Sequence, residues 1–319
     1  MPTPHSPSAS SRGFLLVVLA SLCWGTSGFS GQIAADRAGL GPLDIAWHRM
    51  AIGAVVLSLG FALTRRRRNG PTPTPLARGT AVRLALVGAG LAAYQLAYFA
   101  AVASAGVSIA TLVALGLAPL LIAVGAALLG HGRPDRATVV ALVVALVGLV
   151  LLVGVSAGAD TGTAVVLGAL LAVGSALGYS VVTLAGSGVP AGVPVTLAGF
   201  AGGALLLTPV ALIAGLTFTT DPVALAVLLY LGAVPSALAY SMFFTGLRSV
   251  PGAVASIVTL LEPLTATALA TAFLGERLAP GALAGGLLVL AAVAGLYLRR
   301  MGDSNSRGVA PNPLSKRAP

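Results

Sequence analysis

The chain has 319 residues, of which 57% are hydrophobic and only 8% are charged. A soluble domain carries about 25% charged residues, so this composition excludes a soluble protein. The single cysteine, Cys23, excludes an internal disulfide and a multi-cysteine metal site.

Ten apolar segments follow one another along the chain, separated by short polar breaks. A helix that spans a bilayer needs about 20 apolar residues, and segments of this kind predict transmembrane helices. The predicted spans are 14–33, 43–63, 83–103, 107–129, 137–155, 163–184, 194–215, 223–244, 253–274 and 281–298. The flanking segments 1–12 and 301–319 are predicted to be disordered tails. The sequence therefore predicts an all-α integral membrane protein with ten transmembrane helices.

The basic residues fall mostly on one side of these predicted helices. With the N-terminus in the cytoplasm, fifteen of the eighteen Lys and Arg residues lie in cytoplasmic loops and tails. Arg37 and Arg277 fall outside, and Arg49 lies within a helix. Because positive charge gathers on the cytoplasmic side, we expect both termini in the cytoplasm. The net charge of +10 then reflects topology and contact with anionic membrane lipid, and nucleic-acid binding is not expected.

The two halves of the chain share an order of elements. At an offset of 144 residues, four residues of the first half recur in the second: Leu117, Pro119, Leu120 and Ala126 align with Leu261, Pro263, Leu264 and Ala270. This predicts one repeat over 13–156 and another over 161–298. Because each repeat holds five helices, the second enters the membrane inverted, a common transporter plan with the site between the halves. The segment Phe14–Cys23 also suits a signal-peptide core, but its place in the repeat favours retention.

Three stretches make the chain resemble the EamA-type ten-helix permeases of the drug/metabolite transporter superfamily. They are "LCWGTSGF" (22–29), "DIAWHRMAIGAVVL" (44–57) and "LEPLTATALATAFLGERL" (261–278). The resemblance implies a small-molecule permease, often an exporter of amino acids or related metabolites, with a central cavity between the halves. In the first half Ala118 stands where Glu262 would pair, so the resemblance does not imply a pair of carboxylates.

Glu262 lies near the centre of the ninth predicted helix, where an acid costs about 2.5–3.5 kcal/mol on insertion scales. Thr259, Ala266 and Ala270 share its face at helical spacing, and Pro263 frees the carbonyl one turn earlier. Two interpretations stay open: Glu262 binds a proton or a substrate ammonium group, or it is a structural carboxylate bonded to a neighbouring helix. Coupling to protons and facilitated diffusion are both open as energetic schemes.

Two basic side chains adjoin in the second predicted helix. Arg49 lies about 9 Å inside the outer end of that helix, at 1.5 Å per residue. It is predicted to bind a substrate carboxylate or to pair with an acid in a gate, and the alternative is that it reaches outward to Asp44. His48 lies on another face; it could titrate near neutral pH, but a lone intramembrane histidine is more often a packing residue.

Polar aromatic residues at mid-helix depth complete the candidate site. In a chain with only 5% aromatic residues, their presence there indicates a cavity lining, and hydrogen-bonded packing between helices is the alternative. The set is Trp24, Tyr94, Tyr98, Tyr179 and Tyr240, together with the amide of Gln95.

These features predict a multi-pass secondary transporter of the cell membrane. Its substrate is expected to be a small metabolite, an amino acid or a related compound, exported by alternating access. An intramembrane enzyme or a non-transporting scaffold is the alternative. The sequence has no Walker motif, and its three histidines are widely separated. We therefore expect no cofactor, no metal and no enzymatic activity.

Overall fold

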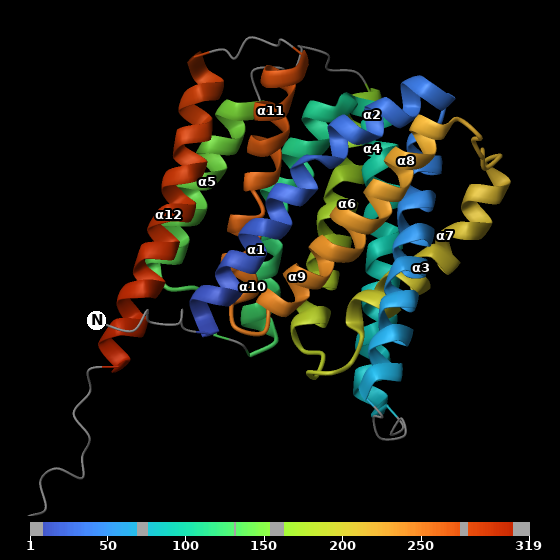
Figure 1. The fold of residues 1–319 in the computed structure, drawn as a ribbon. Helices are drawn as coiled ribbons and strands as arrows, with labels where there is room; N and C mark the ends of the chain where they lie inside the picture. The colour runs from blue at the N-terminus through green and yellow to red at the C-terminus, as the bar shows by residue number, and fades with distance from the viewer. Residues whose placement is uncertain (1–8, 69–75, 131, 154–162, 275–279, 309–319) are drawn as a thin grey trace, which may run out of the picture.

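The computed structural model describes residues 9–68, 76–130, 132–153, 163–274 and 280–308, and these residues form a bundle of helices (Figure 1). No strand occurs in the described residues. In chain order the helices are α1 (Ala9–Gly25), α2 (Ser27–Ala38), α3 (Pro42–Arg68), α4 (Arg78–Leu128), α5 (Arg136–Val153), α6 (Thr163–Ser187), α7 (Val195–Ile213), α8 (Pro222–Leu231), the π-helix η2 (Gly232–Leu238), α9 (Ala239–Gly246), α10 (Gly252–Val258), α11 (Leu261–Leu274) and α12 (Pro280–Gly308).

Within the described ranges, nine helical segments are long and apolar enough to cross a membrane, and Arg136–Leu152 is a shorter apolar helix. They correspond to the ten predicted spans, so the predicted all-α membrane fold is confirmed. Large apolar side chains cover the outside of the bundle: Leu205 is 73% exposed and Ile213 is 88% exposed. Such a surface suits hydrocarbon rather than water as its solvent.

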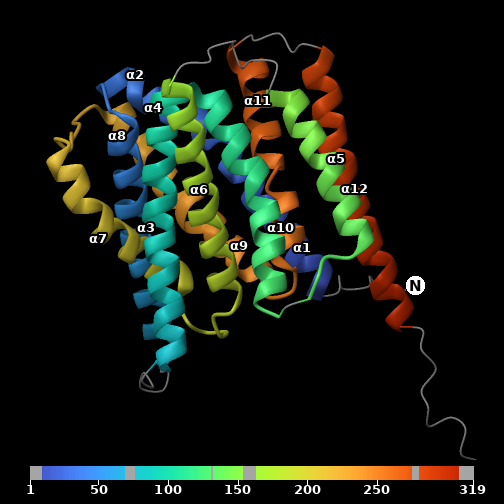
Figure 2. The ribbon, with the colours of Figure 1, turned by 180° about the vertical axis from the view of Figure 1, so that it is seen from behind.

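The start of α1 and the end of α12 lie at the same end of the bundle, which we call the terminal end (Figure 1). At one edge α12 packs along α5, and at the other α3 packs against α7 (Figure 2). The most extensive contact joins α4 to α6. Among the broken segments, α1 contacts η2, α9, α10 and α11, and its residues Leu15, Leu19 and Leu22 are exposed.

The helices extend beyond the predicted spans. Residues 9–12 and 301–308, expected in disordered tails, are helical, because α1 begins at Ala9 and α12 continues to Gly308. Hydropathy marks only the part of a helix that suits lipid, whereas backbone hydrogen bonding continues past it. The rest of both predicted tails, the loop residues 154–162, and Arg277 lie outside the described residues.

Two predicted helices, 83–103 and 107–129, are joined without a loop within α4. Gly106 stands between them with φ 80° and ψ 165°, a backbone conformation that is essentially restricted to glycine. The flanking spans Arg78–Gly106 and Ile109–Leu128 are each long and apolar enough to cross a membrane. A single glycine therefore makes the hairpin.

Three helices predicted as continuous are interrupted. The span 14–33 breaks at Thr26, between α1 and α2. The span 223–244 contains the π-helix η2 with Pro235 inside it. The span 253–274 breaks at Thr259 and Leu260, between α10 and α11. Proline lacks the N–H that a regular helix needs, which accounts for two of these interruptions.

Candidate functional site

One cavity lies beside the breaks at Thr26 and Thr259, whose neighbouring residues line it, and Tyr240 lines it from α9, which follows η2. The cavity offers about 40 Å³ to the centres of water molecules, and one water needs roughly 10–15 Å³ on this measure. In this conformation it therefore holds a few waters or one small chemical group. Its lining residues are Trp24, Ser27, Arg49, Tyr94, Leu115, Tyr179, Tyr240, Thr259 and Glu262.

Glu262 stands in the first turn of α11, directly after the break. Pro263 has no N–H to donate to the carbonyl of Thr259 four residues earlier. That carbonyl instead accepts from the backbone N–H of Glu262 at 2.9 Å. Because of the break, the carboxylate of Glu262 lies at the beginning of a half-helix, where the helix dipole favours negative charge. The predicted continuous face shared by Thr259, Glu262 and Ala266 is thus divided at the cavity.

Arg49 reaches the cavity from α3 and contacts the π-helix. Its Nε donates to Ser236 Oγ at 3.4 Å, a long and weak bond. Ser236 Oγ in turn donates to the carbonyl of Leu231 at 2.7 Å, the carbonyl four residues before Pro235, to which proline has no N–H to donate. The π-helical turn therefore holds a hydroxyl beside the guanidinium. The alternative pairing with Asp44 is not formed, because Asp44 accepts from the backbone N–H groups of Gly41 and Thr217.

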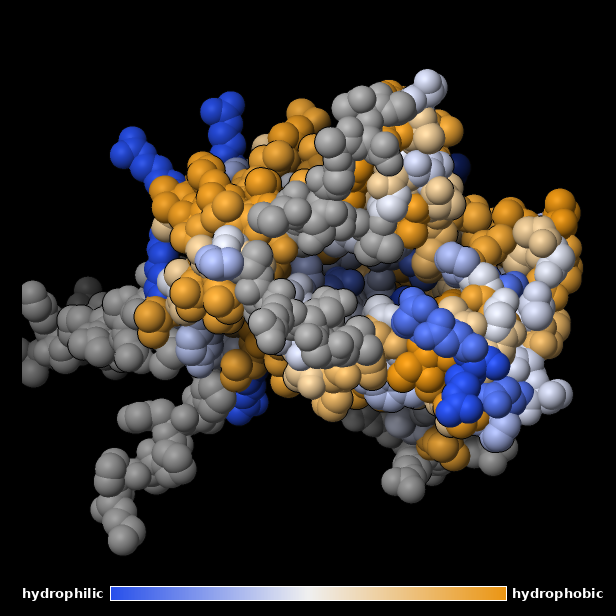
Figure 3. Space-filling model, turned by 90° about the horizontal axis from the view of Figure 1, so that it is seen from above, coloured by the Kyte–Doolittle hydropathy of each residue, from blue (hydrophilic) through white to orange (hydrophobic). Residues whose placement is uncertain are grey.

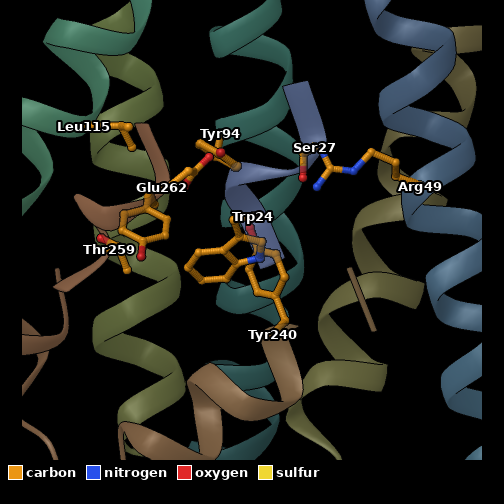
Figure 4. A pocket seen from close by; sticks show the side chains of 9 residues that line it. Trp24, Ser27, Arg49, Tyr94, Leu115, Tyr240, Thr259 and Glu262 are labelled. Atoms are coloured by element: carbon orange, nitrogen blue, oxygen red, sulfur yellow. The ribbon is translucent and has the colours of Figure 1, made fainter. Parts of the chain in front are cut away.

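The two charged residues face the cavity from opposite sides (Figure 4). They are not joined directly, because the one ion pair found in the described part of the chain links Arg299 with Asp135. A guanidinium and a carboxylate held apart across a small cavity are complementary to a solute that carries both charges. Trp24 and Tyr240 lie below the gap between Glu262 and Arg49 in this view.

Aromatic rings form one wall of the cavity. The ring centroids of Trp24 and Tyr240 are 4.7 Å apart, and those of Trp24 and Phe243 are 5.2 Å apart. Tyr94 and Tyr179, on facing helices, have centroids 5.9 Å apart. Tilted contacts at these distances are favourable for aromatic pairs. This wall presents apolar ring faces to the aliphatic or aromatic part of a solute.

Gly25 brings α1 against the start of α11. A Cβ at this position would overlap Thr265 Cβ and would lie 2.8 Å from the carbonyl oxygen of Glu262. Only glycine permits this approach. The contact holds the α1–α2 break, with Trp24 and Ser27 on either side of it, against the start of α11.

The structure brings six of the nine predicted site residues into the cavity lining: Trp24, Arg49, Tyr94, Tyr179, Tyr240 and Glu262. It places the other three elsewhere. The ring of His48 contacts the carbonyl of Asp44 at 2.7 Å and packs against Phe218. Tyr98 shares a hydrogen bond of 2.8 Å with Thr111 across the α4 hairpin, and Gln95 is buried outside the lining.

Three lining residues are not among the predicted binding residues: Ser27, Leu115 and Thr259. Thr259 is predicted only as a neighbour of Glu262. Ser27 lies in the run "WGTSG" (24–28), whose small residues mark a helix break. Leu115 carries no signal, because nothing in an apolar run distinguishes a cavity-facing leucine from one that faces lipid.

The end of the bundle opposite the termini is hollowed at its centre, and hydrophilic residues are visible within the hollow (Figure 3). No group of three or more His, Cys, Asp or Glu side chains that could hold a metal occurs among the residues described. The charges at the cavity therefore come from Arg49 and Glu262.

The sequence matches a family model described as the EamA-like transporter family, over residues 11–154 and again over residues 166–298. The chain belongs to the EamA-like transporter family. The predicted resemblance is thereby confirmed, and membership makes the chain a multi-pass membrane protein with a small-molecule substrate.

A curated relative of this EamA-family chain is the uncharacterized transporter YwfM of Bacillus subtilis (strain 168). It is 31% identical over 255 residues, which are 80% of this chain and 83% of that protein. A solved crystal structure of a protein is similar over 91% of this chain and 99% of its own, with a TM-score of 0.76. At 23% identity it shows that the fold is shared.

Proposed function

We propose that this EamA-family protein is a secondary transporter that exports amino acids or closely related metabolites by alternating access. The opposition of Arg49 and Glu262 across the cavity carries the proposal. An amino acid presents a carboxylate and an ammonium group on one carbon, and these two charges complement the two walls. The aromatic wall with Trp24 and Tyr240 would receive the side chain.

Alternating access requires the cavity walls to move, since the present space holds a few waters only. Three wall segments are interrupted next to the cavity, at Thr26, at Pro235 and at Thr259. Interrupted helices of this kind occur at the binding sites of secondary transporters. They support a mechanism in which half-helices swing about their breaks.

We further propose that the two halves, 13–156 and 161–298, are inverted repeats. The two separate matches to the family model support this division. The start of α1 and the end of α12 lie at the terminal end of the bundle. The helix α3, whose last four residues are arginines, also ends there. The positive-inside rule then supports a location of both termini on the cytoplasmic side of the cell membrane. The exporting direction is what the resemblance to EamA-type permeases implies.

The proposal is tested by counterflow into liposomes that contain the full-length protein. Twenty labelled amino acids are offered to liposomes preloaded with the same unlabelled compounds, and protein-free liposomes serve as the control. We expect counterflow of at least one amino acid, lost in Arg49→Gln protein of normal elution volume. Absence of counterflow for all twenty would reject amino acids as substrates.

Two energetic schemes follow from the position of Glu262, and one variant separates them. If Glu262 carries a proton through the cycle, Glu262→Gln should keep equilibrium exchange but lose its response to an imposed pH gradient. If transport is facilitated diffusion, the gradient should have no effect on wild-type protein or on the variant. Gradient-driven transport by well-folded Glu262→Gln would end the coupling hypothesis.

A further inference from the structure

Three buried polar groups in the cavity wall have no hydrogen-bond partner among the described residues: Trp24 Nε1, Ser27 Oγ and Tyr179 Oη. The indole Nε1 of Trp24 makes no hydrogen bond, although the residue is only 5% exposed and lines the cavity. The chain's other tryptophan shows the usual arrangement: the indole of Trp47 donates to Thr208 Oγ1 at 2.9 Å. Buried polar groups normally find partners, so the unmet donor of Trp24 indicates a ligand.

A second unmet group lies close by in sequence. The hydroxyl of Ser27 is buried with no hydrogen-bond partner in the described part of the chain, and Ser27 lines the same cavity. Ser27 is the first residue of α2, and the preceding Thr26 makes no side-chain cap there. Instead, the hydroxyl of Thr26 donates to the carbonyl of Cys23 and shares a hydrogen bond with the hydroxyl of Tyr230. The N-terminus of α2, which favours an anion, is therefore left without a capping side chain.

Arg49 faces the same part of the cavity. In Figure 4 its guanidinium points toward the hydroxyl of Ser27, and the indole nitrogen of Trp24 lies on the side of its ring toward Arg49. The indole and the guanidinium only donate hydrogen bonds, and a serine hydroxyl can donate. Two donor-only groups and a hydroxyl that can donate line this wall, which favours a ligand group that accepts, and the guanidinium favours a negative one.

We infer that Trp24, Ser27 and Arg49 form a carboxylate subsite, which deepens the proposed function and rests on it. A monoanion fits better than a phosphate dianion, because one cation lines this wall and Glu262 stands opposite. The planar carboxylate matches the guanidinium in a two-pronged contact. The indole and the hydroxyl each donate to one of its oxygens, and the ammonium group of a substrate then faces Glu262.

The subsite is tested by NMR on full-length protein in lipid nanodiscs, labelled with ¹⁵N at its two indole nitrogens. Trp24→Phe assigns the resonances, and Trp47, whose donor is occupied, is the internal control. The probes are 4-methylpentanoate, 3-methylbutylamine and inorganic phosphate. We expect 4-methylpentanoate to move the Trp24 indole proton downfield and to leave Trp47 unchanged, with little response to the other two. Ser27→Ala should raise the Kd for 4-methylpentanoate about tenfold, as for one lost hydrogen bond to a charged group.

The outcomes separate this inference from the transport proposal. A Trp24 resonance that ignores 4-methylpentanoate, or that responds equally to the amine or to phosphate, overturns the subsite. If Ser27→Ala does not fold, the wild-type titration still decides. Counterflow of amino acids without a Trp24 response would reject the subsite and keep the transporter. A specific Trp24 response without counterflow would keep the subsite and reject amino-acid transport.

Discussion

Replacing Gly25 by alanine should disturb both the stability of the protein and its binding site. The added Cβ would overlap Thr265 Cβ and lie 2.8 Å from the carbonyl oxygen of Glu262, where a carbon–oxygen contact needs about 3.3 Å or more. Rotation of the Thr265 side chain cannot relieve this overlap, because it leaves the Cβ atom in place. The start of α11 must therefore move from α1 by roughly 0.5 Å or more, judged by the same contact limit.

Overpacking of this kind costs about 1–3 kcal/mol, although alanine favours a helix over glycine by about 1 kcal/mol. We expect a net loss of thermal stability and an affinity for the transported amino acid that is lower by about tenfold, because Trp24 and Ser27 shift relative to Glu262. Thermal unfolding followed by tryptophan fluorescence and equilibrium binding in nanodiscs measure the two effects.

Gly28→Ala is the matched control, since a Cβ there meets nothing within 4 Å. It adds the same methyl group one turn further along, so it should be neutral or slightly stabilising. Gly25→Ala that behaves like Gly28→Ala in both assays would refute the close contact between α1 and α11.

Three further predictions address the other elements around the site. Gly106→Ala should destabilise the α4 hairpin by about 1–3 kcal/mol, because φ 80° and ψ 165° are strained for alanine; an unchanged melting temperature would contradict this. Ser236→Ala should weaken binding of a carboxylate solute about 2- to 10-fold, the value of one ordinary hydrogen bond, because the bond to Arg49 is long at 3.4 Å. It should leave binding of an amine solute unaffected. Ser58→Ala is the control, because the Ser58 hydroxyl donates to the carbonyl of Ala54, and it should change the binding of neither solute. Asp135 accepts from the N–H of Thr138 at the start of α5 and pairs with Arg299, which lowers the pKa of Asp135 from 3.8 to about 2. The stabilising contribution of ionised Asp135 should be present above about pH 4 and lost as the pH falls toward 2. Asp135→Ala should therefore lower the melting temperature at pH 7 but not at pH 2. Equal effects at both pH values would exclude a stabilising role for the ionised carboxylate at the start of α5.

Hydropathy was sufficient to predict which segments cross the membrane, because lipid selects long apolar helices whatever their packing. It could not predict the breaks at Thr26 and Thr259, since those depend on backbone hydrogen bonds that hydropathy does not register. Pro263 gave a partial signal, and its missing N–H does coincide with the α10–α11 break.

The site residues also differ in how well the sequence predicted their positions. Glu262 and Arg49 were predictable because charge inside a membrane is costly and seldom faces lipid. His48 adjoins Arg49 in sequence but lies on another side of α3, against Phe218, and Tyr98 bonds within the α4 hairpin. Helices that are apolar all round have no periodic pattern that shows which face is inside. The depth of a residue in the membrane could therefore be predicted from the sequence, but the direction in which its side chain points could not.

The central claim is that Arg49 and Glu262 bind the two charges of one solute. The most direct measurement compares the affinity of the best-transported amino acid with those of its carboxamide and its decarboxylated amine, in wild-type protein and in Arg49→Gln. In the wild type we predict that both analogues bind at least about tenfold more weakly, the loss of one charge-assisted contact. In Arg49→Gln the amino acid and its carboxamide should bind alike. A carboxamide or amine that binds the wild-type protein as tightly as the amino acid would contradict the account.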